Sequence, residues 1–206
     1  MIFALFFKSI LVGLAIAAPV GPIGALCINR SLTRGFWAGV AGGLGTALAD
    51  ASYGAAAALG FAAFSAALAT ISTPLALFGG AFLIFLGWRE MRKTGADPAP
   101  DKAGRGDLAR TIATTYALTI ANPATILSFV AIFAGFGLAD AGGGIAPAIV
   151  VAGVFAGSLL WWIFLSGLVA VIRHRLPREF ARWVARISGG ILIGFGLVAI
   201  STAFPH

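Results

Sequence analysis

Residues 14–24 read LAIAAPVGPIG and residues 118–123 read LTIANP, so a similar apolar stretch that runs into a proline occurs twice in the chain. Proline removes a backbone N–H and its ring clashes with the preceding helical turn. Glycine costs about 1 kcal/mol relative to alanine inside a helix. We therefore expect a broken helix at each place, at matching positions in two related halves.

Both motifs lie within long apolar stretches. The chain is 60% hydrophobic and 10% charged, whereas a soluble domain carries about 25% charged residues. A membrane barrel would show short segments that alternate apolar and polar residues, and these stretches are apolar throughout. Six of them approach the roughly 20 residues that a helix needs to cross a bilayer. The sequence predicts an all-α membrane protein whose six transmembrane helices occupy residues 9–28, 36–60, 74–88, 112–138, 144–172 and 184–203.

The basic residues orient these spans. Of 14 lysines and arginines, 13 follow the first, third and fifth spans, and the other connections carry almost no charge. The positive-inside rule then places both termini outside, so the topology is N-out/C-out. Arg30 and Arg34 are expected to anchor the cytoplasmic end of the first span; the alternative is that they attract an anionic group at the entrance. This distribution accounts for the net charge of +7 without nucleic acid, which we do not expect as a partner.

A cleaved signal peptide is the alternative for the N-terminus, because Ala15, Ile16 and Ala17 resemble a cleavage site. Against it, no basic segment precedes the apolar stretch, and the hydrophobic pattern continues beyond the supposed cut.

The two halves match at further positions. Residues 80–87 read GAFLIFLG and residues 189–196 read GGILIGFG, and between the anchors Gly45 with Thr46 matches Gly157 with Ser158. Three spans in each copy force the copies to cross the membrane in opposite senses, as in many secondary transporters. We predict one transmembrane domain, residues 1–206, built from two inverted three-helix repeats. Repeat 1 is about 1–93, a cytoplasmic linker about 94–110, and repeat 2 about 111–206.

The predicted breaks are the first candidate site. Pro19, Gly21 and Pro22 interrupt the first span, and Asn122 with Pro123 interrupt the fourth. Freed carbonyls and half-helix N-termini at such breaks bind substrates in transporters. An ordinary proline kink is the alternative for either break alone.

Asp50 is the one acidic residue well inside a predicted span. A charge there is costly, so such residues usually serve ions, protons or substrate. We expect Asp50 to bind a substrate ammonium group or a coupling proton; the alternative is a neutral acid that ties helices together. Thr46 and Tyr53 share its helix face. Trp162 is expected on the opposite side of the site, although tryptophan also suits lipid-facing positions.

In this order the motifs resemble the LysE/RhtB family of amino-acid exporters. The likeness covers APVGP at 18–22, NRSLTRGFWAGVAGGLGTALAD at 29–50, GGAFLIFLGWREMR at 79–92, ANP at 121–123, GSLLWW at 157–162 and RISGGILIGFG at 186–196. The resemblance implies a multi-pass exporter of the bacterial cell inner membrane, driven by the proton motive force and forming a homodimer. Its substrates would be amino acids or similar small metabolites.

Other functions fit the sequence less well than amino-acid export. A divalent metal-ion exporter would want several hard or borderline ligands, and Asp50 is the only carboxylate inside the spans. A thiol oxidoreductase normally needs two thiols, and Cys27 is the only cysteine. A non-transporting membrane assembly role is the remaining alternative. No catalytic dyad is recognisable, so we expect no enzyme, cofactor or metal site.

Overall fold

The computed structural model describes residues 2–19, 21–92, 105–122, 125, 129, 144–173 and 178–202. Every regular element within these residues is helical, which confirms the predicted all-α class. In chain order the helices are α1 (Ile2–Ala17), α2 (Pro22–Arg34), α3 (Phe36–Met91), α4 (Arg105–Ile120), α6 (Ala146–Ile172) and α7 (Arg178–Thr202).

The predicted first span is two helices rather than one. α1 ends at Ala17, α2 begins at Pro22, and their axes differ by 83°. The predicted break is therefore confirmed, and a straight crossing over residues 9–28 is excluded. At 13 residues, α2 is about 20 Å long and too short to cross a bilayer alone.

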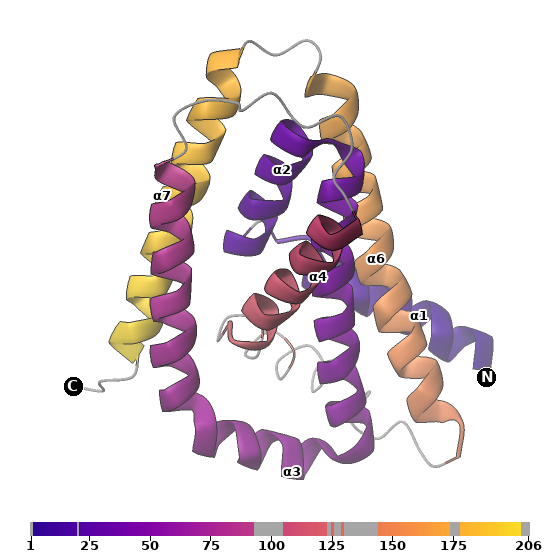
Figure 1. Ribbon diagram of the computed structural model, residues 1–206. Coiled ribbons are helices and arrows are strands. Elements are labelled where there is room, and N and C mark those ends of the chain that lie inside the picture. Colours follow the sequence, from indigo (N-terminus) through magenta and orange to yellow (C-terminus); the bar gives the residue numbers. More distant parts are fainter. Residues whose placement is uncertain are drawn as a thin grey trace.

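Helix α3 joins the predicted second and third spans. It runs for 56 residues with Pro74 inside it, whereas the sequence predicts a connection between residues 60 and 74. Its first part, residues 36–57, and its last part, residues 76–91, form two arms on opposite sides of the molecule (Figure 1). The alanine-rich sequence of residues 55–69 favours continued helix. A proline inside a membrane helix is tolerated where neighbouring groups satisfy the freed backbone.

Three helices begin before the predicted spans. α1 begins at Ile2, α4 at Arg105 inside the predicted linker, and α7 at Arg178. Hydropathy detects the part of a helix that suits lipid, while the hydrogen-bonded helix continues through polar residues. Of the predicted fourth span, the part after Asn122 lies outside the described residues except for Thr125 and Phe129.

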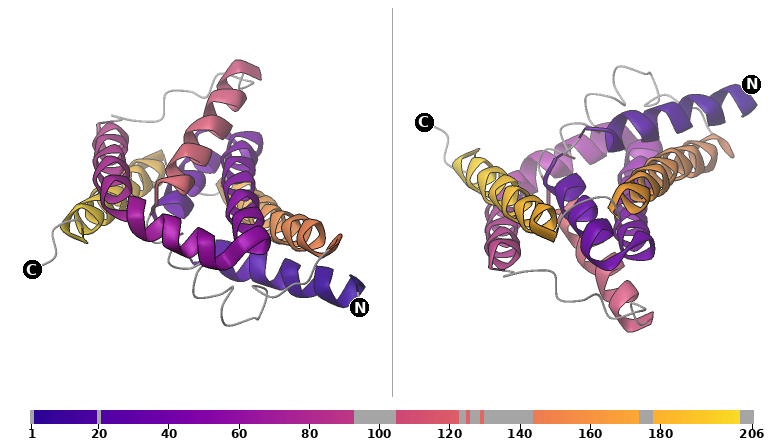
Figure 2. Two further views of the ribbon diagram at one scale, coloured as in Figure 1. Left: turned by 90° about the horizontal axis from the view of Figure 1, so that it is seen from below. Right: turned by 90° about the horizontal axis from the view of Figure 1, so that it is seen from above.

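Helix α2 is the central element. It contacts α3, α4, α6 and α7, and two views along perpendicular directions place it among them (Figures 1 and 2). Eight of its residues are buried, including Asn29 and Ser31. Ser188 of α7 donates a hydrogen bond to the Ala25 carbonyl of α2 at 3.0 Å. A short, partly polar helix is thus enclosed by longer apolar ones.

The last arm of α3 packs on α7 through paired glycines. A Cβ on Gly80 would lie 2.7 Å from the Gly196 carbonyl oxygen, and one on Gly196 would lie 2.6 Å from the Gly80 carbonyl oxygen. Gly87 and Gly189 face each other in the same way, at 2.5 and 2.7 Å. Only glycine allows backbones to approach so closely, which is the usual role of small residues between membrane helices.

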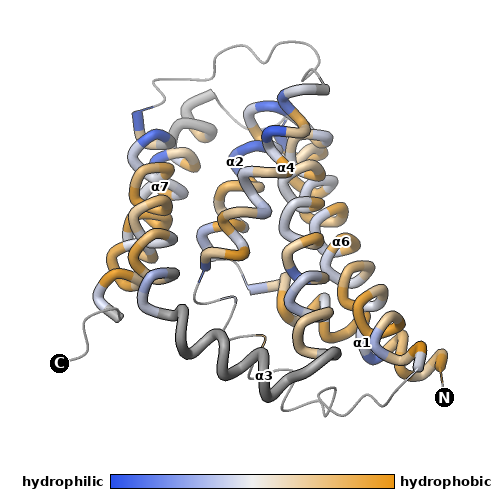
Figure 3. Tube along the Cα trace, turned by 60° about the horizontal axis from the view of Figure 1, so that its bottom comes forward, coloured by the Kyte–Doolittle hydropathy of each residue, from blue (hydrophilic) through white to orange (hydrophobic). Residues whose placement is uncertain are grey.

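The surface of the bundle suits lipid along most of its length. Hydrophilic residues gather at one end, where α2 and α3 end and α4 begins (Figure 3). Among the described residues, α6 and the segment Trp183–Ser201 of α7 are long and apolar enough to cross a membrane, and α1 with α2 form a third span if the bent pair is counted as one. This is a membrane protein by composition and helix length, and the number of six crossings stays a prediction.

Candidate functional site

Asp50 lies in the interior of the bundle, on the first arm of α3. Its side chain is 1% exposed. Ser158 of α6 donates a hydrogen bond to Asp50 Oδ2 at 2.7 Å. The other carboxyl oxygen, Oδ1, has no hydrogen-bond partner among the described residues. A buried polar atom left unpaired costs roughly 1–3 kcal/mol, so each such atom calls for an explanation, of which a functional role is one.

Trp162 is another buried side chain with an unmatched polar atom, as is Ser31 of α2. It is 3% exposed, and its Nε1–H has no hydrogen-bond acceptor within the part of the chain that the structure describes. It follows Ser158 by one turn of α6 and therefore lies on the same face. Its side chain fits against Gly43 of α3, where any Cβ would overlap it. The interior thus holds an unmatched acceptor on Asp50 of α3 and an unmatched donor on Trp162 of α6, the helix that also carries Ser158.

Trp162 also lies beside the first helix break. It forms an apolar cluster with Ala17, Ile23 and Cys27, which come from the end of α1 and the start of α2. Between these helices Pro19 is exposed and Pro22 is buried. Gly21 is the N-cap of α2 with an extended backbone, and its carbonyl accepts the Ala25 amide at 3.0 Å. Amides in the first turn of α2 have no partner within their own helix, and they carry the positive end of its dipole.

The second predicted break is also a helix end. α4 stops at Ile120, and the Asn122 amide donates to the Thr119 carbonyl at 3.2 Å in a tighter turn. The Asn122 side chain is buried. Pro123 lies outside the described residues. Loss of regular helix before Asn122 therefore agrees with the predicted interruption.

Tyr53 connects α3 to this second break rather than to Ser158. Its hydroxyl donates to the Ile120 carbonyl at 2.5 Å, and its ring lies 5.3 Å from the Phe129 ring. Thr46 donates to the Gly42 carbonyl of its own helix at 3.3 Å. Thr46, Asp50 and Tyr53, which the sequence places on one helix face, therefore have three different hydrogen-bond partners. Asp50 bonds to α6, Tyr53 to the end of α4, and Thr46 to α3 itself.

Sequence reasoning missed a row of threonines on α4. Thr111, Thr115 and Thr119 are buried, and Thr115 and Thr119 each donate to the carbonyl four residues earlier. Arg30 of α2 donates to Thr115 Oγ1 at 2.5 Å. The spacing of four residues places all three on one face, and this regular polar spacing in an apolar helix was the available signal.

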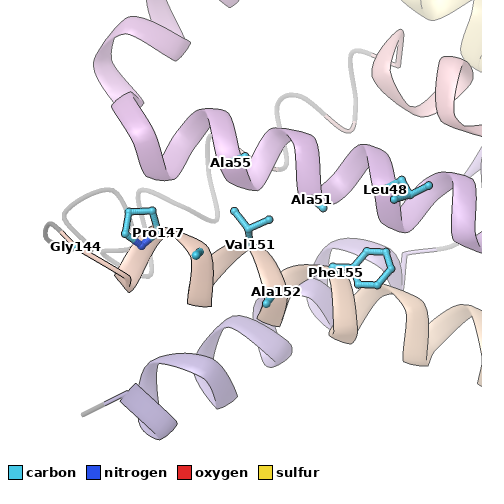
Figure 4. A pocket seen from close by; sticks show the side chains of 9 residues that line it. Leu48, Ala51, Ala55, Gly144, Pro147, Val151, Ala152 and Phe155 are labelled. Carbon is cyan, nitrogen blue, oxygen red and sulfur yellow. The ribbon is translucent and has the colours of Figure 1, made fainter.

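A separate hollow on the bundle is apolar. It is an open groove of about 670 Å³ between α3 and α6, and it contains none of the predicted site residues (Figure 4). It is lined by Leu48, Ala51, Ala55, Gly144, Pro147, Ala148, Val151, Ala152 and Phe155. The described residues contain no group of three or more histidine, cysteine, aspartate or glutamate side chains that could hold a metal ion.

Comparison with known proteins gives consistent results. The family of LysE type translocators matches residues 14–202. The chain is 29% identical over 196 residues to the "Putative amino acid efflux protein YcgF" of Bacillus subtilis (strain 168), covering 93% of each protein. It is 29% identical over 181 residues to the uncharacterized membrane protein YahN of Escherichia coli (strain K12), covering 82% of this chain and 77% of that protein. No solved structure matches.

Proposed function

The chain belongs to the LysE type translocator family, and from that premise we propose that it exports amino acids or related small metabolites across the bacterial inner membrane, driven by the proton motive force. The family is one of transporters rather than enzymes, and transport of a small molecule through a membrane is therefore its class of function. The resemblance to a protein named for amino acid efflux supports the substrate class.

The observation that carries the proposal is the buried Asp50 carboxylate with one oxygen held by Ser158 and the other unpartnered among described residues. An ammonium group would donate to Oδ1, and a coupling proton would bind there equally well. The unmatched Nε1–H of Trp162 is a donor suited to a carboxylate or carbonyl oxygen. An amino acid carries an ammonium group and a carboxylate, so each of the two atoms suits one of its charged groups. Acidic side chains inside membrane bundles commonly serve such roles.

The two helix breaks extend this site. Gly21 and Pro22 begin a short interior helix whose first amides favour anionic groups. Asn122 is buried where α4 ends. In our proposal both breaks border the substrate path, together with Pro19, Pro123, Thr46 and Tyr53. The residues at each break either bind substrate or act as hinges. Substrate affinity, measured in variants of these residues, distinguishes the two roles.

Contacts between the halves support the proposed inverted repeat. The matching motifs 80–87 and 189–196 are 109 residues apart, because 189 − 80 = 109. The counterpart of Gly80 is therefore Gly189, and the counterpart of Gly196 is Gly87. The contact between Gly80 and Gly196 corresponds to a contact between Gly189 and Gly87, and this second contact is also present. Gly45 packs on the α4 backbone, and its counterpart Gly157 packs on the α1 backbone. An approximate two-fold relation between the copies would produce this exchange.

Further details of the assembly belong to the same proposal. The division into repeat 1, linker and repeat 2, the N-out/C-out topology and the homodimer stay predictions. Arginines stand at the ends of α2 and α3 and near the start of α4. Hydrophilic residues gather at this end of the helices (Figure 3), which supports a cytoplasmic position for it.

Efflux from cells tests the proposal. Cells that express the chain are loaded with a panel of labelled amino acids and dipeptides, and release is followed with and without a protonophore. We expect faster release of at least one compound, and Asp50→Asn should lower that rate about 10- to 100-fold, because a hydrogen bond to a charged group contributes about 1.5–3 kcal/mol. Asparagine keeps an acceptor for Ser158 while removing the charge.

Asp107→Asn is the matched control, because Asp107 is exposed in the first turn of α4 and should leave release unchanged. Exchange of labelled for unlabelled compound without a proton gradient separates the two roles of Asp50. Loss of exchange indicates ammonium binding, whereas retained exchange with lost net efflux indicates proton coupling. Full efflux by Asp50→Asn with unchanged pH dependence would remove Asp50 from the mechanism.

A further inference from the structure

Arg30 differs from the other arginines in its position. It lies on the enclosed helix α2, one turn before the end of that helix, and it is partly buried. Most of the other described arginine side chains are exposed, as expected of residues that anchor a protein at the membrane surface, while Arg173 at the end of α6 is partly buried. These exposed residues are Arg34, Arg89, Arg92, Arg110 and Arg186.

The Arg30 guanidinium is oriented by a completely buried hydroxyl group. Its Nη1 donates to Thr115 Oγ1 at 2.5 Å, and Thr115 is 0% exposed. Thr115 donates its own proton to the Thr111 carbonyl at 2.8 Å, so its oxygen can only accept from Arg30. This contact fixes the orientation of the guanidinium relative to α4.

Gly42 of α3 makes room for this arrangement. A Cβ at Gly42 would lie 2.9 Å from Cys27 Sγ, 3.3 Å from Arg30 Nη1 and 3.7 Å from Thr115 Oγ1. The missing side chain allows three helices to converge around the guanidinium. Asp50 follows Gly42 by eight residues, or about 12 Å along α3. The interior therefore contains a cationic group and a carboxylate at two different depths.

We propose that Arg30, oriented by Thr115, binds the carboxylate of the exported amino acid. The planar guanidinium matches a carboxylate with two parallel N–H donors, which gives both charge and geometric selection. The ammonium and carboxylate of one α-amino acid are much closer together than 12 Å, so Arg30 and Asp50 act on the substrate in succession. Thr115 is a positioning residue. This inference rests on the proposed export of amino acids, and it replaces the expected anchoring role of Arg30.

Matched pairs of compounds test the inference. Purified protein in liposomes is assayed for exchange of leucine, threonine, lysine and glutamate, and of the α-amide of each, which lacks the carboxylate charge. We expect the wild-type protein to prefer the acid over its amide, and Arg30→Gln to reduce that preference about 10- to 100-fold through a higher KM for the acid. Thr115→Val should reduce it about 3- to 10-fold, and Arg34→Gln should leave it unchanged.

Two failures can be distinguished in this assay. If the wild-type protein exchanges none of the acids, the proposed export of amino acids is wrong. If it exchanges an acid and Arg30→Gln keeps the same ratio of acid to amide, the carboxylate site is wrong and the export is not. Elution of each variant at the wild-type volume in size-exclusion chromatography, with the milder Thr115→Val change, controls for misfolding.

Cys27 supplies an independent readout. It is the only cysteine of the chain, it is buried, and its sulfur approaches the same Gly42 position as Arg30. We expect the exported acid to change the rate at which a methanethiosulfonate reagent labels Cys27, and its amide to have at least tenfold weaker effect at equal concentration. In Arg30→Gln this difference should disappear. Equal effects of acid and amide on the wild-type protein would overturn the inference.

Discussion

Adding one methyl group at Gly189 or at its neighbour Gly190 should have opposite effects on stability. At Gly189 a Cβ would lie 2.7 Å from the Gly87 carbonyl oxygen and would also overlap the Met91 side chain. Ordinary contacts between carbon and oxygen are about 3.3–3.6 Å, so α3 and α7 must separate locally by about 0.6–0.9 Å. Overpacking of this kind costs about 1–3 kcal/mol. At Gly190 nothing lies within 4 Å, and alanine should stabilise the helix by up to about 1 kcal/mol.

Thermal unfolding in detergent measures the difference. One kcal/mol shifts Tm by roughly 2–4 °C in a protein of this size, so we expect Gly189→Ala to lower Tm by about 2–12 °C and Gly190→Ala to leave it equal or raise it. Gly80→Ala and Gly196→Ala should each lower Tm by similar amounts, because each presses on the other's carbonyl. Their combined effect should be smaller than the sum, since either change already separates the helices.

Equal losses in Gly189→Ala and Gly190→Ala would refute this packing, because they would mean that α7 does not present Gly189 to α3. Strictly additive losses in the Gly80 and Gly196 pair would contradict their direct contact.

Three further changes test the contacts around the site. Ser158→Ala removes the hydrogen bond to Asp50 and should lower the free energy of unfolding in detergent by about 1–3 kcal/mol, while Ser201→Ala, at an exposed position, should not. Tyr53→Phe removes the donor to the Ile120 carbonyl and should lower the free energy of unfolding by about 0.5–1.5 kcal/mol in the same measurement. An unchanged free energy of unfolding would mean that this hydrogen bond does not stabilise the end of α4. Gly43→Ala should lower both the transport rate and the Tm in detergent, because its Cβ would lie 2.1 Å from Trp162 Cβ, an atom that moves only with the α6 backbone.

Local chemistry made part of the fold predictable. The helix break between Ala17 and Pro22 follows from two prolines and a glycine in five residues, and the end of α4 near Asn122 follows from the next proline. Hydropathy, however, does not report the direction in which a chain continues after a break. Residues 9–28 therefore read as one crossing, although α2 turns by 83° into the interior.

The continuity of α3 could not be predicted for a similar reason. Pro74 signals a helix end in sequence, while the alanine-rich segment before it signals helix. Only packing around the proline decides between these tendencies, and the helix continues.

Asp50 stood out in sequence because a single carboxylate in an apolar helix has few structural explanations. Its partner in space, Ser158, is 108 residues away, and the repeat placed that residue in the right region without identifying the bond. Thr115 was missed because a threonine that bonds to its own helix is common in membrane spans. Its contact with Arg30 depends on how α2 is enclosed, which no local pattern contains.

Flux through the purified protein tests the proposed export of amino acids most directly. Liposomes containing the wild-type chain or Asp50→Asn are loaded with labelled amino acids, a pH gradient is imposed across the membrane, and release is measured against empty liposomes. We predict that the wild-type protein releases at least one amino acid faster when the gradient is imposed, and that Asp50→Asn loses this acceleration. Release equal to that of empty liposomes for every amino acid would contradict the proposal that this chain is an amino-acid exporter.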